Sequence, residues 1–422
     1  MKIAIFVQQL EFMGGVERVV LEQLRIFAAH GVELTLFVER PVRLMAHAVC
    51  VPVVVLSKDG ATRGKLWQES FDRSRPDMLI FHGVSHECAK SDITMAKKNG
   101  IPTIGVVHFA FPGNVALDGR GNSWRTFREN GADCTAFATV SRIDALWWRA
   151  LGMRAFHVQN PFVHPKNADL SRRPGEDGTT NLIWVGRQAE PKQPSAALAA
   201  FARVHAAEPK TRLTMIGGSA AGWKPFRKAA ARLGCADAVE FISERPDLNA
   251  YWEKAHIHLL TSVVESFCLV WAEAKAAAIP TVMYELPYLE LAEDPRGYVA
   301  VEQRNIEALA DAVLALVRDP ERRRIMGEEA KESLAAFNDE AVWTSWQRLF
   351  EGLKTDTEGW DVPKDLKTVV EQIYAAYAFR KEKHQWEENM EADFRKLTRW
   401  SLRPFARFLE RCVEMARKIK HV

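Results

Sequence analysis

The chain of 422 residues is longer than one ordinary domain, so two or three domains are expected. Its hydrophobic fraction of 47% and charged fraction of 26% are those of a soluble globular protein, and no apolar run reaches the roughly 20 residues that span a bilayer. The net charge is only +3, yet residues 394–422 carry nine Lys and Arg against two acids, which predicts a basic tail that meets an anionic surface.

The N-terminal segment and the cysteines narrow the cellular setting. The first residues, MKIAIFVQQLEF, lack the long apolar core of a signal peptide and are typical of a first β-strand. The six cysteines are scattered, without a CxxC pair or a Cys/His cluster. We therefore expect no zinc site, no disulfide framework, and a reducing cytoplasm.

The first part of the chain alternates strands and helices. An apolar strand over residues 2–8 is followed by a glycine turn at Gly14 and Gly15 and by an amphipathic helix over 17–30, which ends at Gly31. This order predicts a βαβ unit. The apolar runs predict further strands over residues 32–39, 51–56, 78–82, 103–108, 135–139 and 155–158.

A polar stretch rich in Pro and Gly over residues 160–181 predicts a linker, and a second alternating series follows it. The domains are therefore expected over 1–165 and 180–350, with a basic amphipathic helical extension over 363–422. In the second series we expect strands over 181–187, 212–218, 238–242, 256–261 and 281–284, helices over 195–207, 223–233, 247–254 and 269–278, and helical structure over 305–352.

Two carboxylates flank the start of one predicted helix. Glu265 follows the strand at 256–262, and Glu273 lies about one turn inside the helix that Pro280 ends. Ligands of open α/β sheets bind at the carboxyl ends of strands, where helix N-termini attract anions. A carboxylate there is better placed to accept hydrogen bonds from hydroxyl groups than to meet a phosphate. The alternative is that Glu265 interacts with the helix dipole and Glu273 is solvated.

Several segments occur in an order that resembles the retaining glycosyltransferases of the GT-B fold, family 4. The resemblance covers about residues 1–350 and rests on the ordered set FMGGVERVV, VVHFAF, GRQAEPKQ, MIGGSA, FISERPDL and VVESFCLVWAEA. It implies an α/β fold of two Rossmann-like, doubly wound domains that face a cleft, with the acceptor on the N-terminal side and the nucleotide-sugar donor on the C-terminal side.

The resemblance also implies roles for particular residues. Arg187 and Lys192 would bind the diphosphate, Glu265 the hydroxyls of the donor sugar, Glu273 the ribose, and His108 would lie near the transferred sugar. The remaining donor-binding residues that it implies are Gly14, Gly15, Gly217, Gly218, Ser266, Phe267, Cys268 and Leu269.

This sequence departs from the family pattern at Ser266, Cys268 and Ala278, where the family often has glycine. The structural alternatives are an ordinary turn at the first glycines, a buried strand histidine for His108, and a solvated loop pair for Arg187 and Lys192.

The resemblance implies a retaining hexosyltransferase that uses a UDP-sugar, or alternatively GDP-mannose, with a glycan or lipid-linked glycan as acceptor in surface polysaccharide biosynthesis. No DxD stands in a suitable context, so we expect a reaction without metal or other cofactor, in which Arg187, Lys192 and helix N-termini stabilise the leaving group. The alternatives are a catalytically silent nucleotide-sugar-binding or scaffold protein and, more weakly, an epimerase of similar architecture.

The tail leaves two partners open. Its apolar and aromatic residues recur at helical spacing between basic residues over 390–422. Such a helix suits an anionic membrane surface, which would place the protein on the inner face of the plasma membrane, but it equally suits packing on the enzyme or on a second copy. Nucleic acid is not expected, because no base-reading motif accompanies the charge.

Overall fold

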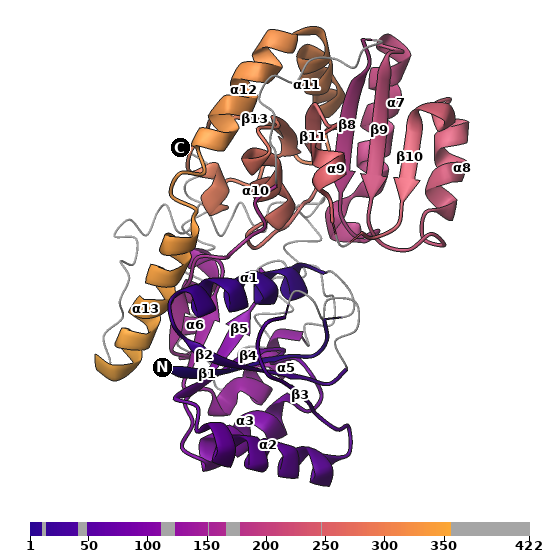
Figure 1. Cartoon of the computed structure of the whole chain (residues 1–422). Helices are drawn as coiled ribbons and strands as arrows, with labels where there is room; N and C mark the ends of the chain where they lie inside the picture. The colour runs from indigo at the N-terminus through magenta and orange to yellow at the C-terminus, as the bar shows by residue number, and fades with distance from the viewer. Residues whose placement is uncertain are drawn as a thin grey trace. The chain divides into compact units, whose positions relative to one another are not determined.

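The computed structural model describes residues 1–10, 14–40, 49–110, 123–150, 152–165, 178–245 and 247–355. The chain divides into two compact units, coloured mainly indigo to purple and magenta to orange (Figure 1). The first unit consists of Met1–Pro161 together with the chain from Asp339, and the second of Phe162–Asn338. The predicted extension over 363–422 lies outside the described residues.

The first unit is built on a parallel sheet whose described strands run in the order β3-β2-β1-β4-β5-β6-β7. Residues of β1, β4, β5 and β6 are almost all buried, as expected for strands covered by helices on both faces. Its elements are β1 (Lys2–Val7), α1 (Gly15–Ala29), β2 (Glu33–Val38), β3 (Val53–Val55), α2 (Gly60–Ser74), β4 (Met78–His82), α3 (Ala89–Lys98), β5 (Thr103–Val107), α5 (Ser123–Asn130), β6 (Ala136–Thr139), α6 (Arg142–Ala150), β7 (Ala155–His157) and α13 (Asp339–Thr355).

Helix α13 packs on the first unit although it follows the second unit in the sequence. The ring of Phe27 on α1 meets Trp343 and Trp346 edge to face, with centroids 5.4 and 5.5 Å apart, and each such pair is worth about 0.5–1.5 kcal/mol beyond its buried area. The guanidinium of Arg25 donates to both carboxylate oxygens of Asp339, at 2.7 and 2.9 Å. Residues 339–350, which the sequence analysis assigned to the second domain, therefore belong to the first.

The second unit is built on a parallel sheet in the order β10-β9-β8-β11-β12-β13 among the described strands. The strand β13 was not predicted; it is four residues long and mostly half-buried. The elements are β8 (Thr180–Val185), α7 (Pro194–Ala207), β9 (Thr211–Ile216), α8 (Lys224–Arg232), β10 (Val239–Ile242), α9 (Asn249–Trp252), β11 (Ile257–Leu260), α10 (Leu269–Ala276), β12 (Thr281–Tyr284), β13 (Tyr298–Val301), α11 (Ile306–Arg318) and α12 (Pro320–Glu332).

Both sheets reverse their strand order at one point, between β1 and β4 in the first unit and between β8 and β11 in the second. At such a switch point the loops that leave the two strands diverge. The carboxyl ends of the strands form the usual ligand-binding edge of an α/β sheet. The predicted pair of Rossmann-like, doubly wound domains is thus confirmed. The loops after β8 and β11 carry Arg187, Lys192 and Glu265, so the predicted donor residues follow the switch point of the second sheet.

Candidate functional site

Two loops at the switch point of the second sheet are joined by hydrogen bonds. The buried hydroxyl of Thr261, just after β11, donates to the carbonyl of Lys192 at 2.8 Å, and it accepts from the indole N–H of Trp184 at 3.0 Å. The N–H of Val263 donates to the carbonyl of Pro191 at 2.9 Å. These bonds fix the short 3-10 helix Glu190–Lys192 against the loop that leads to α10.

Lys192 and Glu265 form an ion pair at this edge of the sheet. The ammonium Nζ of Lys192 donates to Oε1 of Glu265, and the two side chains are 21% and 10% exposed. Burial alone would lower the pKa of Lys192, but the Glu265 carboxylate outweighs it and raises the pKa above its usual value. The backbone N–H of Glu265 donates to the hydroxyl of Tyr288 at 3.1 Å. The ammonium of Lys192 is therefore charged at neutral pH, and hydrogen bonds hold the pair in place while both side chains stay partly accessible.

Arg187 lies nearby in the same loop. Its side chain is exposed, and its positive charge is close enough to offset part of the rise that Glu265 causes in the pKa of Lys192. The structure thus brings together three of the four predicted catalytic residues, Arg187, Lys192 and Glu265, on one edge of the second unit.

Two residues that follow Glu265 have the left-handed backbone conformation that glycine favours, although neither is glycine. Cys268 caps the N-terminus of α10 with φ +71°, and Ala278, just past the C-terminus of that helix, has φ +54°. These are two of the positions at which the sequence departs from the family pattern. The left-handed conformation costs an L-residue roughly 1–2 kcal/mol. The local geometry is therefore held by the surrounding structure at both positions.

The side chains around Cys268 are mostly withdrawn from solvent. Phe267 is 3% exposed and packs against Phe162 and Phe337, with centroids 6.4 and 6.0 Å apart, while Ser266 and Leu269 are partly exposed. Burial first, and then the nearby Glu265 carboxylate, raise the pKa of the Cys268 thiol well above its usual value. The thiol is therefore protonated at neutral pH and poorly suited to act as a nucleophile.

Glu273 lies inside α10 and is only 1% exposed, so the structure does not present it beside Glu265 at the surface. Its predicted contact with a ribose stays a prediction. Lys275 on the same helix is also buried, and its Nζ lies over the rings of Trp271 and Tyr298 and donates to Ser333 at 2.8 Å. Burial lowers the pKa of Lys275 to about 8.

The glycines after β9 allow a close crossing of two loops. A Cβ at Gly217, where φ is +133°, would lie 2.1 Å from the carbonyl oxygen of Gly186. A Cβ at Gly218 would lie 2.5 Å from Oε1 of Gln188, whose Nε2 donates to the carbonyl of Ser219 at 3.0 Å. Gln188 therefore bridges the loops after β8 and β9. Sequence reasoning missed it, and its only signal is its position directly after Arg187.

In the first unit, His108 follows β5 and pairs with a second histidine. Its Nε2 lies 2.8 Å from Nδ1 of His82, and Nε2 of His82 lies 2.8 Å from Oε1 of Gln23. Burial lowers the pKa of His108 to about 4, and it lowers the pKa of His82 well below its usual value. Both rings are therefore neutral at pH 7. Neither His82 nor Gln23 was predicted, because their signal is spatial.

The two glycines before α1 show no special constraint. Gly14 has φ −70°, a conformation open to any residue, and a Cβ there would meet only the flexible carboxylate of Glu17, at 2.6 Å. Gly15 begins the helix and is exposed. Their predicted approach to a donor or acceptor stays a prediction.

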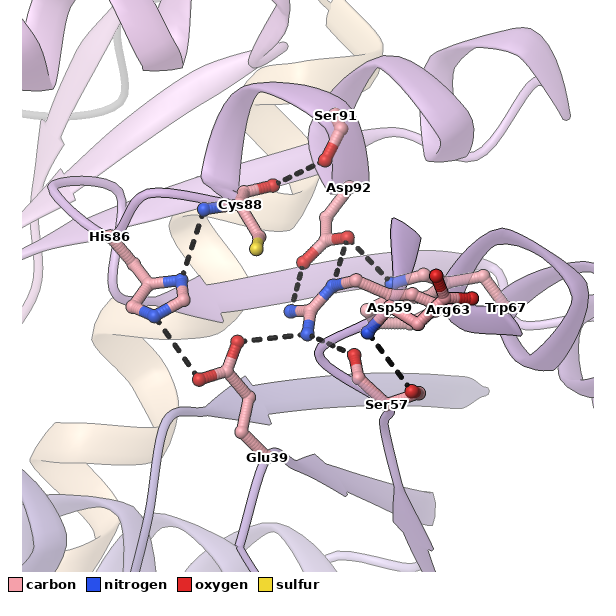
Figure 2. Close-up of polar contacts among 9 residues, drawn as sticks. All are labelled: Glu39, Ser57, Asp59, Arg63, Trp67, His86, Cys88, Ser91 and Asp92. Atoms are coloured by element: carbon pink, nitrogen blue, oxygen red, sulfur yellow. Dashed lines mark hydrogen bonds and ion pairs between the residues drawn. The ribbon is translucent and has the colours of Figure 1, made fainter. Parts of the chain in front are cut away.

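One cluster in the first unit offers metal-ligand atoms. A carboxylate oxygen of Glu39, a ring nitrogen of His86 and the sulfur of Cys88 lie within 4.8 Å of one another. His86 Nε2 is 3.1 Å from Glu39, and its Nδ1 accepts from the backbone N–H of Cys88 at 3.2 Å (Figure 2). The sequence analysis, which found no Cys/His cluster, missed this grouping because Glu39, just past the end of β2, is far from His86 and Cys88 in the sequence.

The same cluster already contains a cation. The guanidinium of Arg63 lies 2.8 Å from Oε1 of Glu39 and donates to both oxygens of Asp92, at 2.7 and 2.5 Å (Figure 2). Trp67 also donates to Asp92, at 2.9 Å. Burial raises the pKa of the Cys88 thiol, which works against a thiolate ligand. The arrangement is best described as a buried ion-pair network that ties α2 and α3 to the end of β2.

A hollow of about 850 Å³ in the second unit is formed by parts of β8, β9, β10 and α9, and its lining includes Arg212, Arg227 and Lys254. None of the predicted site residues lines it. Within the described part of the chain, no helix is long and apolar enough to cross a membrane.

Residues 167–333, most of the second unit, match the family model described as Glycosyl transferases group 1. The chain is 31% identical over 180 residues to a D-inositol 3-phosphate glycosyltransferase of Corynebacterium aurimucosum, covering 41% of this chain and 43% of that protein. It is 30% identical over 182 residues to an exopolysaccharide phosphotransferase of Streptomyces coelicolor, covering 42% of this chain and 19% of that protein. The chain thus spans less than half the length of these two relatives.

Solved structures share the fold over most of the chain. Anabaena HepE in complex with UDP matches 84% of this chain and 100% of its own, with a TM-score of 0.67 and 16% identity. The same protein with UDP-glucose gives a TM-score of 0.68, and TarM gives 0.69 at 13% identity and 83% coverage of this chain. At such identities the likeness establishes the fold, which is GT-B.

Proposed function

We propose that this protein is a glycosyltransferase that moves a sugar from a nucleotide-sugar to an acceptor hydroxyl. The observation that carries the proposal is the Lys192–Glu265 ion pair at the switch point of the second sheet, with Arg187 beside it. This edge brings two cations and an acceptor of hydroxyl hydrogen bonds together from two loops. A nucleotide-sugar presents the matching groups, a diphosphate and a sugar rich in hydroxyls. The family match of residues 167–333 supports the same reading.

In the proposed reaction the bond between the anomeric carbon and the diphosphate oxygen breaks, and a bond from the acceptor hydroxyl oxygen to that carbon forms. The hydroxyl proton passes to the departing phosphate oxygen on the same face, so the anomeric configuration is retained. Arg187 and Lys192 stabilise the negative charge that grows on the leaving group. Glu265 holds Lys192 in place and accepts from hydroxyls of the donor sugar.

Other residues bind in this proposal without taking part in bond making. Backbone N–H groups of Phe267, Cys268 and Leu269, at the start of α10, contact the sugar or the phosphate. Glu273 binds the ribose, which requires a local movement because its side chain is buried here. His108 hydrogen-bonds the transferred sugar. Cationic side chains supply the charge compensation, so we propose a reaction that needs no metal.

For the substrates we propose a UDP-sugar donor, with GDP-mannose as the alternative, and a glycan or lipid-linked glycan as acceptor in surface polysaccharide biosynthesis. The UDP and UDP-glucose bound to HepE support the choice of nucleotide. We propose that the enzyme works in the cytoplasm at the inner face of the plasma membrane.

The test is to incubate the purified full-length chain with a panel of UDP- and GDP-sugars and a glycan acceptor, and to detect products by mass spectrometry. NMR of the product's anomeric proton reports retention or inversion. The matched variants are Lys192→Met, which should lose most turnover, and Lys228→Ala, which removes an exposed lysine of α8 and should keep it. Nucleotide-sugar binding without transfer or hydrolysis of any donor would instead support the silent binding protein.

A further inference from the structure

The turn between β13 and α11 carries a glutamine whose side chain reaches two neighbouring loops. Nε2 of Gln303 donates to the carbonyl of Glu285 at 3.0 Å and to the carbonyl of Val263 at 3.2 Å. Glu285 follows β12, and Val263 lies in the loop that leads from β11 to α10. Since β12 separates β13 from β11 in the sheet, one side chain joins the loops after three adjacent strands.

The orientation of the Gln303 amide follows from its two partners. A carbonyl oxygen only accepts, so the end of the side chain that faces two carbonyls must be the NH2 group, which has two hydrogens to donate. The reverse orientation would bring the amide oxygen against two other oxygens. That oxygen is buried and accepts from no residue of the described chain, so the two donated bonds alone orient the amide.

The loop after β11 leads from Gln303 directly to the ion pair. The backbone N–H of Val263 donates to the carbonyl of Pro191, the residue before Lys192, at 2.9 Å. The carbonyl of Val263 accepts from Gln303, so this residue, which is 1% exposed, is held at both of its backbone polar groups. Glu265 comes two residues later in the chain. A segment fixed in this way therefore carries the carboxylate to Lys192.

The loop after β12 reaches Glu265 from the other direction. Tyr288 lies three residues after Glu285 and is 7% exposed, and its hydroxyl accepts from the backbone N–H of Glu265 at 3.1 Å. The backbone of Glu285 is in turn held by Gln303. Directly after Gln303 the chain turns through Arg304 with φ +64°, a left-handed conformation that a residue other than glycine keeps only where the surrounding structure defines it.

We propose that Gln303 is a positioning residue that fixes Glu265 opposite Lys192 by bracing the loops after β11 and β12. It makes its hydrogen bonds to the backbone of Val263 and Glu285, so it acts on the ion pair through the two loops. In the proposed reaction a displaced carboxylate or ammonium would stabilise the transition state less. The effect on turnover rests on the proposed function, whereas the bracing of the loops does not.

Hydrogen exchange of the full-length protein, followed at single amides by mass spectrometry, tests the bracing without a substrate. Gln303→Leu removes both donors at similar size, and Gln303→Glu keeps the shape but presents an oxygen to the two carbonyls. In both variants the backbone amides of Val263 and Glu265 should exchange about tenfold faster or more, because two hydrogen bonds that hold the loops are lost.

The matched control is Gln347→Leu, at an exposed glutamine of α13, which should leave the exchange of both amides unchanged. Wild-type exchange at Val263 and Glu265 in a folded Gln303 variant, as judged by circular dichroism, would overturn the proposal. If Gln303→Leu fails to fold, Gln303→Glu decides.

Steady-state kinetics with an active donor tests the link to Glu265. Gln303→Leu should lower kcat about tenfold and change the KM for the donor by less than about twofold, as expected of a residue that acts on the transition state. In the Glu265→Gln background the same change should lower kcat by less than about twofold, because the carboxylate that Gln303 positions is already gone.

Two kinetic results would refute the positioning role. One is an unchanged kcat in Gln303→Leu, and the other is an undiminished loss in the Glu265→Gln background, which would leave Gln303 with an effect on stability alone. If the exchange accelerates as expected but the wild-type chain transfers no sugar from any donor, the proposed function fails and the bracing of the loops stands.

Discussion

Replacing Lys192 by methionine tests the ion pair as both a structural and a chemical element. The change keeps an unbranched stem of similar length and removes the charge, which leaves the Glu265 carboxylate 10% exposed without its partner. Breaking a fully buried ion pair costs about 3–5 kcal/mol, and breaking an exposed pair costs about 0–1 kcal/mol. With side chains 21% and 10% exposed, this pair lies between these limits.

We therefore expect Lys192→Met to destabilise the second unit by about 2 kcal/mol, which for a domain of this size lowers Tm by about 4–8 °C. The double variant Lys192→Met with Glu265→Gln removes both charges and should recover about half or more of the lost stability. Turnover should stay lost in both proteins, because neither has the ammonium at the diphosphate.

The assay combines calorimetric melting of the four proteins of this cycle with the transfer assay. A coupling free energy near zero would refute the description of the pair as partly buried and mutually stabilising. Full activity in either variant that lacks the ammonium would refute the assignment of Lys192 to the leaving group, even if the stabilities behave as expected.

The remaining predictions concern the two acids, one strained residue and the buried histidines. Glu265→Gln should mainly lower kcat. Glu273→Gln should mainly raise the KM for the nucleotide-sugar, because ribose contacts persist unchanged into the transition state. Steady-state kinetics with an active donor checks both variants, and the reverse pattern would exchange the roles of the two acids. Ala278→Gly should stabilise the protein by about 0.5–1 kcal/mol in chemical denaturation, since φ is +54° there, and a loss of stability would show that the methyl group packs favourably. Burial lowers the pKa of His108 to about 4 and that of His258 to about 3. The unfolded chain, with a histidine pKa near 6.5, binds protons that the folded state excludes, so stability should fall from pH 6.5 toward pH 4, by about 1–2 kcal/mol per histidine at pH 5. Denaturation at pH 7 and pH 5 measures this fall, and His258→Asn should make it smaller.

Local pattern was enough to predict most of the architecture. Strands β4 and β12 coincide with the predicted ranges, and most other elements differ at their ends by one or two residues. Buried parallel strands are continuous apolar runs, and amphipathic helices repeat every 3.6 residues, so both are visible in a short window of sequence. The strand β13 was missed, and its residues are not the buried run of a central strand.

The order of motifs also placed the predicted donor residues Arg187, Lys192 and Glu265 after strands, and parallel strands end on one edge of the sheet. By itself, however, the sequence could not pair them. Lys192 and Glu265 are 73 residues apart, and they meet because β8 and β11 are neighbours at the switch point of the sheet. The left-handed backbone at Cys268 and Ala278 could not be predicted either, because neither cysteine nor alanine favours that conformation.

Tertiary structure alone decided the environment of His108 and the place of α13. Strand adjacency puts His82 and His108 on one face of the sheet, and α1 adds Gln23 behind them. Aromatic side chains of α13 pack around Phe27, which joins the end of the described chain to its beginning. The physical reason is common to these cases: periodicity and propensity act between neighbours in sequence, whereas pairing, burial and pKa depend on which segments the fold brings together.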